Sequence, residues 1–99
     1  MAEFKNDELG YSFEVADKPK VYDQMRYWSA IQRTGDKSDL FQRYWEAARE
    51  LVQGWACDVL ALDADLEKID DPRATAIIMK VGMAVYTHIV TLEAVPKNS

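Results

Sequence analysis

The sequence predicts a mostly α-helical fold, a small helical domain of three to four helices with a short extended or β N-terminal arm. Three observations predict it. Apolar residues recur at three- and four-residue steps over 17–33 and 39–55, a nearly continuous apolar segment follows Pro72, and only residues 11–15 alternate with the two-residue period of a strand. Because helical spacing covers most of the chain, helices are expected to build the core.

The length of 99 residues fits one domain, which we divide into an extended arm (1–17), a helical core (18–92) and a C-terminal tail (93–99). Twelve Lys and Arg against seventeen Asp and Glu give a net charge of −5, which argues against nucleic acid as a partner. The acidic N-terminus has no apolar signal segment. We therefore expect the protein in the cytoplasm, which is the host cytoplasm if it is a phage protein.

The arm is the only segment with strand periodicity. Tyr11, Phe13 and Val15 fall on one side of it. No equally plain matching strand follows downstream. The segment should therefore pair with a second copy, lie as an extended arm, or form a small hairpin with residues 2–6.

A first helix is predicted from the capping residue Asp17 and from Pro19 to Arg33, ended by Thr34-Gly35. Its buried face should carry Val21, Met25, Trp28 and Ile31.

A second helix is predicted after a cap at Ser38 or Asp39. Its aromatic face is Phe41, Trp45, Ala48, Val52 and Trp55.

Residues 57–71 are the most acidic part of the chain. Helical spacing of the apolar residues favours a short helix here, although a continuation of the second helix or an irregular link also fits. Its acidic residues include Asp58, Asp63, Asp65 and Glu67. They form either a solvated face that keeps the chain soluble or a docking surface for a basic partner.

The last helix has the strongest start signal, Asp70-Asp71-Pro72, and should run to about Leu92. Lys80 near its centre argues against a membrane span. Since this helix is apolar nearly all round, it must be covered on more than one side, and we expect a second copy of the protein to cover part of it. The protein should therefore be a homo-oligomer.

No chemical motif is found. His88 is the only histidine and lies among apolar residues, and the lone Cys57 has no cation beside it. A calcium-loop reading starting at Asp63 fails because its sixth and twelfth positions are Lys68 and Ala74. The four glycines are isolated, so no phosphate loop is present. We predict no catalytic, cofactor-binding or metal-ligating residue and no small-molecule substrate.

Protein binding remains the best-supported class of function. Aromatic residues beside the core rings, together with the arm and the last helix, are the candidate interface, although the same aromatic residues fit equally well an interpretation in which they only widen the core. The predicted interface residues are Tyr11, Phe13, Val15, Tyr27, Tyr44, Ile78, Val81, Val85 and Ile89.

The order of segments resembles the tail assembly chaperones of long-tailed bacteriophages. The extended piece YSFEV, the helix 17–33, the aromatic helix FQRYWEAARELVQGW and the ending LEAVPKNS carry this resemblance over residues 11–98. In that family the short form often ends near a programmed frameshift site. Pro96-Lys97-Asn98 is compatible with the codons CCA AAA AAC, which contain the slippery heptamer A AAA AAC.

The resemblance implies a non-enzymatic chaperone that binds the tape-measure protein, keeps it soluble and helps to recruit tail-tube subunits. It carries over no catalytic or ligand residue. Two alternatives remain: an acidic adaptor or inhibitor that docks on a basic protein surface, and a small enzyme that uses paired carboxylates.

Overall fold

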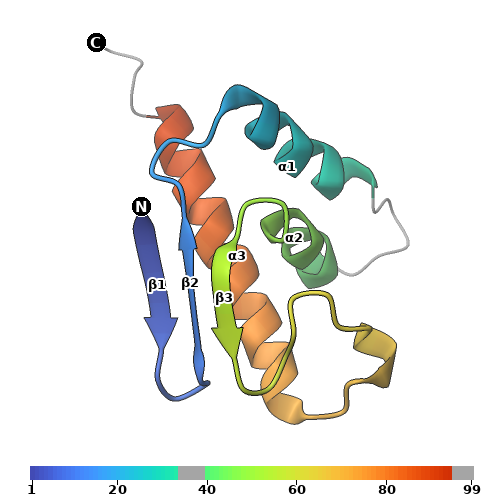
Figure 1. Ribbon diagram of the computed structural model, residues 1–99. Coiled ribbons are helices and arrows are strands. Elements are labelled where there is room, and N and C mark those ends of the chain that lie inside the picture. Colours follow the sequence, from blue (N-terminus) through green and yellow to red (C-terminus); the bar gives the residue numbers. More distant parts are fainter. Residues whose placement is uncertain (34–39, 95–99) are drawn as a thin grey trace.

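A three-stranded antiparallel sheet packs against helices, so the fold is α/β and the prediction of a mostly α-helical domain is wrong (Figure 1). The computed structural model describes residues 1–33 and 40–94. The elements in chain order are β1 (Ala2–Asn6), β2 (Tyr11–Val15), α1 (Val21–Arg33), α2 (Leu40–Ala48), β3 (Gln53–Cys57), a short 3₁₀ helix (Leu66–Lys68) and α3 (Pro72–Ala94).

The predicted arm is a β-hairpin, the third of the arrangements left open by the sequence. β1 and β2 pair antiparallel, with Phe4 opposite Phe13. Gly10 closes the connecting turn with a φ of +75°, which glycine adopts without strain, and its N–H donates to the carbonyl of Asn6 at 2.9 Å. β2 therefore lies in the centre of the sheet and not at the end of a free arm.

β3 is the element that overturns the predicted fold, because it occupies the last part of the predicted second helix. α2 ends at Ala48, and the N–H of Leu51 donates back to its carbonyl at 2.9 Å in a tight final turn. The chain then enters the sheet through a bulge opposite β2, where Gly54 has a φ of +61°. Trp55 is therefore a residue of the sheet and not of a helix; it stacks on Tyr11 of β2 with ring centroids 6.1 Å apart and meets Trp45 of α2 edge-on at 5.7 Å.

Residues 57–71 contain one short helical turn, the 3₁₀ helix, in place of the predicted short α-helix. Asp65 caps this turn by accepting a hydrogen bond from the N–H of Glu67 at 3.1 Å. The predicted stop at Thr34-Gly35 and the predicted caps Ser38 and Asp39 lie outside the described residues.

α3 confirms the prediction of a long last helix from Pro72. Asp71 caps it by accepting a hydrogen bond from the N–H of Arg73 at 2.9 Å. One row of side chains is buried: Ala74, Ile77, Val81, Val85 and Ile89. By length and mean hydropathy Pro72–Leu92 would also suffice to cross a membrane, and 28% of this segment is buried within the protein.

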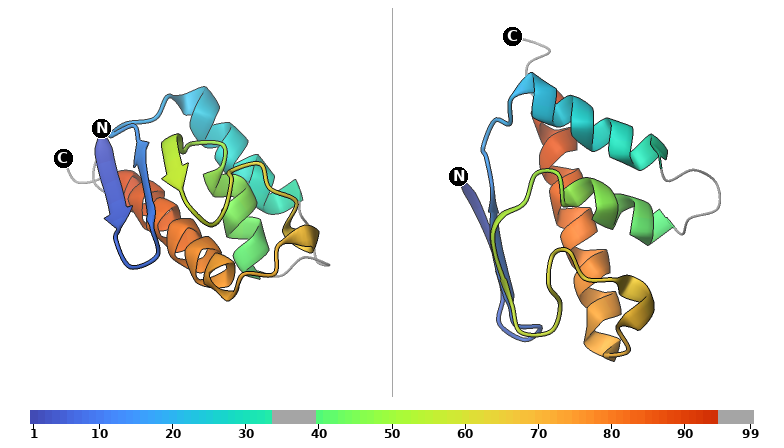
Figure 2. Two further views of the ribbon diagram at one scale, coloured as in Figure 1. Left: turned by 60° about the horizontal axis from the view of Figure 1, so that its bottom comes forward. Right: turned by 45° about the vertical axis from the view of Figure 1, so that its right-hand side comes forward.

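α3 is the centre of the packing. Figure 2 shows it running along one face of the sheet, with α1 and α2 crossing beside it. Gly82 allows α2 to approach closely, since a Cβ atom there would lie 3.1 Å from the Cβ of Tyr44. His88 joins the helix to the end of β2 through a 2.9 Å hydrogen bond between its Nε2 and the carbonyl of Ala16. The sheet thus covers part of the helix for which a second copy was expected.

Candidate protein-binding surface

Most of the predicted interface residues lie inside the core of a single chain. Ile78 and Tyr44 are the two that keep part of their surface exposed. The buried ones are Tyr11, Phe13, Val15, Tyr27, Val81, Val85 and Ile89. In this fold the buried set offers no surface to a partner, so any binding surface must be sought among other side chains.

The most exposed large apolar side chains gather at the start of α1. Val21, Tyr22 and Met25 are 72%, 68% and 60% exposed. We call these three residues the α1 face. Val21 and Met25 were expected on the buried side of this helix, and that expectation is wrong. Because they are four residues apart, they share one side of the helix, as an apolar contact row does.

The inner side of α1 is held by polar contacts as well as by the core. Tyr27 and Ala30 are buried, whereas Trp28 and Ile31 are half-buried. Glu50, which follows the end of α2, faces the first turns of α1. The opposite, apolar side of the first turns remains largely exposed.

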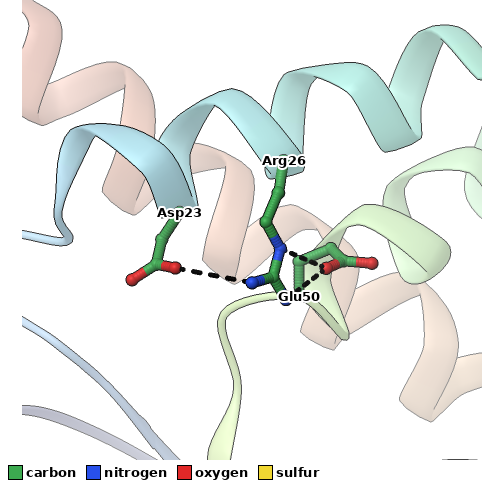
Figure 3. A network of polar contacts seen from close by, with 3 residues as sticks. All are labelled: Asp23, Arg26 and Glu50. Carbon is green, nitrogen blue, oxygen red and sulfur yellow. Dashed lines mark hydrogen bonds and ion pairs between the residues drawn. The ribbon is translucent and has the colours of Figure 1, made fainter.

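Arg26 connects these first turns to Glu50 and also lies near Asp23 (Figure 3). Its Nε and Nη2 atoms donate to Oε1 of Glu50 at 3.2 and 3.1 Å, and Nη1 lies 3.9 Å from Oδ1 of Asp23. The guanidinium also lies 5.7 Å from the ring centroid of Tyr22. Ion pairs this exposed contribute less than about 1 kcal/mol each. These contacts weakly restrict the orientation of α1 and therefore the position of the α1 face.

A second, mostly apolar surface is a shallow and widely open groove between β1 and α3. It has a volume of about 540 Å³, and its walls include Phe4, Met79, Met83 and Ala84, together with the polar residues Asn6, Lys80 and Thr87. Met79 and Met83 are 36% and 45% exposed. Methionine side chains adapt to the shape of a partner. Met79 and Met83 were not among the predicted interface residues. The sequence of this helix is apolar on nearly every side, so it does not indicate which row of side chains faces outwards.

Tyr27 carries a buried hydroxyl that has no hydrogen-bond partner among the residues that the structure describes. Burial raises the pKa of this hydroxyl, and the nearby hydroxyls of Tyr44 and Tyr86 raise that pKa further. Its ring packs edge-to-face on Trp28 at a centroid distance of 5.2 Å. Tyr27 therefore acts as a neutral part of the aromatic core.

Carboxylates line a shallow hollow between α2 and the acidic segment. Glu46, Glu50 and Asp63 contribute to its wall together with Arg49. Arg49 Nη1 lies 2.9 Å from Glu46 Oε1, and Arg26 pairs with Glu50. Two of the three carboxylates are thus held in surface ion pairs.

The acidic segment, residues 57–71, exposes its carboxylates to solvent, which is compatible both with a solvated face and with a docking surface for a basic partner. Asp58, Asp63, Asp65 and Glu67 are all exposed. At its end, the side chain and N–H of Arg73 lower the pKa of Asp71. Within residues 1–33 and 40–94, no three His, Cys, Asp or Glu side chains are grouped to hold a metal ion.

Comparison of the chain with protein-family models, with curated proteins and with solved structures gives no match. The function must therefore be argued from the chain itself.

Proposed function

We propose that this protein is a non-enzymatic tail assembly chaperone of a long-tailed bacteriophage, which binds the tape-measure protein and tail-tube subunits. The observation that carries the proposal is the α1 face, where Val21, Tyr22 and Met25 are each at least 60% exposed. The parts of the segment order that the structure keeps, an extended YSFEV piece, a helix within residues 17–33 and a long last helix, support the family assignment, whereas FQRYWEAARELVQGW is divided between α2 and β3.

The α1 face suits an apolar helix of a partner. A helix docks by placing residues at three- and four-residue steps against a complementary apolar surface, and Val21 and Met25 have that spacing. Tyr22 adds a ring of the kind that is enriched at interfaces. The Arg26–Glu50 contact orders part of α1 before a partner binds, which lowers the ordering cost of binding by a small amount.

The test is co-purification of the full chain with the tape-measure protein encoded in the same genome. The double variant Val21→Gln/Met25→Gln should weaken binding by about tenfold or more, because two apolar contacts are lost. The double variant Leu40→Gln/Val90→Gln is the matched control, since Leu40 and Val90 are exposed elsewhere. Failure of the wild-type chain to bind, or equal weakening by both variants, would contradict the proposal.

The same assay separates the chaperone from the acidic adaptor. Neutralising Asp58, Asp63, Asp65 and Glu67 together leaves the α1 face intact. Binding of the tape-measure protein should therefore stay within about twofold of the wild-type value, since exposed charges contribute little to such a contact. Loss of binding in this variant, with the α1 variant unaffected, would favour an adaptor that docks on a basic surface.

A further inference from the structure

The outer edge of β1 is an unpaired sheet edge. β1 stands at the end of the strand order β1-β2-β3, and no strand within residues 1–33 and 40–94 pairs with its other side. Figure 1 shows β1 as the outermost strand. The outward backbone N–H and C=O groups of an edge strand are a template for a strand of another chain.

The charges on this edge are self-complementary in one register. Glu3 and Lys5 are exposed and flank Phe4. An antiparallel pair of β1 strands related by a two-fold axis through Phe4 sets Glu3 of each copy opposite Lys5 of the other. Opposite charges across strands stabilise a sheet, whereas like charges destabilise it.

The neighbouring registers are disfavoured by the same two residues. A shift of two residues keeps the α3 helices of both copies on the same face of the sheet. In one direction this shift brings Glu3 of one copy opposite Glu3 of the other, and in the other direction it brings Lys5 opposite Lys5. A parallel, in-register arrangement places both like-charged pairs together. Alignment of the faces and charge together therefore favour the antiparallel register centred on Phe4.

On the face of β1 opposite to Glu3 and Lys5, the same register brings apolar side chains of the two copies together. Phe4 lies on the α3 side of the sheet, where it stacks on Phe13 at 4.9 Å and meets His88 edge-on at 6.2 Å between ring centroids. In the same register the two Phe4 side chains lie opposite each other. Met79 and Met83 line the groove beside Phe4, so the seam between the copies is bordered by exposed apolar surface.

We propose that the occupant of this edge is a second copy of this chain. The two hairpins join through β1 into one continuous six-stranded antiparallel sheet, with both α3 helices on the same face. A strand of any sequence could pair with the backbone groups of β1. A second copy of this chain necessarily places a lysine opposite Glu3 and a glutamate opposite Lys5. This dimer does not depend on the proposed function.

The test is sedimentation equilibrium of the full chain over a range of concentrations. E3K and K5E each place two like charges on β1, so each variant alone should dimerise about tenfold more weakly than the wild type. An equimolar mixture of E3K and K5E restores opposite charges at both cross-strand positions. The mixture should therefore form a heterodimer with nearly wild-type affinity.

Two controls separate this result from unfolding and from general charge effects. Glu3 lies opposite Glu14 within the chain, so E3K removes a like-charge pair from the monomer and leaves its circular dichroism unchanged. E67K makes the same change in net charge on the exposed acidic segment and should leave dimerisation unchanged. A wild-type chain that is monomeric throughout, or a mixture as weak as its separate components, would overturn the proposal.

Discussion

The two sides of α3 differ in what they contribute. Ile77, Val81, Val85 and Ile89 are fully buried against the sheet and α2, whereas Met79 and Met83 face outwards beside β1. The buried row uses branched side chains of defined shape, and the outer row uses flexible methionines. One helix thus supplies the core with one row and an adaptable surface with another, so substitutions on the two rows should act on different properties.

The largest effect is expected from the buried row. Ile77→Ala should lower the free energy of unfolding by about 2–5 kcal/mol, because it removes buried apolar groups and leaves a cavity. Met83→Gln, on the outer row, should change it by no more than about 0.5 kcal/mol. Urea denaturation of both variants measures the difference. Equal losses would mean that the outer row is also part of the core.

A smaller effect is expected where α2 crosses α3. In Gly82→Ala the new Cβ would lie 3.1 Å from the Cβ of Tyr44 and 3.4 Å from the backbone N of Trp45. Overpacking of this kind costs up to about 3 kcal/mol, and because the neighbouring atoms are the Cβ of Tyr44 and backbone atoms of α2, which move only with the helix, we expect the cost to exceed the gain of about 1 kcal/mol in helix propensity. Thermal denaturation should therefore show a lower Tm. A higher Tm would contradict the close approach of the two helices.

The smallest effect is expected at the exposed start of α3. Arg73 holds the pKa of Asp71 below its ordinary value, so the ionised carboxylate is stabilising. This contribution is fully present above the unfolded-state pKa, which is near 4, and is lost as the pH falls through the lower folded-state pKa. Asp71→Asn should therefore lower the Tm slightly at pH 7, with the difference from wild type disappearing in acid. A constant difference across this range would contradict the linkage.

Local signals account for the parts of the fold that the sequence predicted. The start of α3 follows from Asp71 and Pro72, which act within one turn. β3 was missed because Val52 and Trp55 satisfy helical spacing, while pairing with β2 depends on residues some forty positions earlier. Gly54 was the available signal, since an isolated glycine next to a predicted helix end also marks a bulge.

The candidate surfaces were harder to predict than the helices. The sequence gives Val21 and Met25 the same apolar stripe as Trp28 and Ile31. The covered side of α1 instead carries Tyr27 and Ala30, which are fully buried, so Val21 and Met25 lie on the outer side. Likewise, the apolar character of α3 could not show which row the sheet would cover, because the sheet itself was not predicted.

Methionine methyl NMR tests the central claim, that separate apolar surfaces serve partner binding and self-association. The chain has four methionines, and Met25 lies on the α1 face while Met79 and Met83 line the groove. Adding the tape-measure protein should shift the Met25 methyl resonance, and diluting the chain alone should shift those of Met79 and Met83. A tape-measure complex that leaves Met25 unchanged would contradict the account.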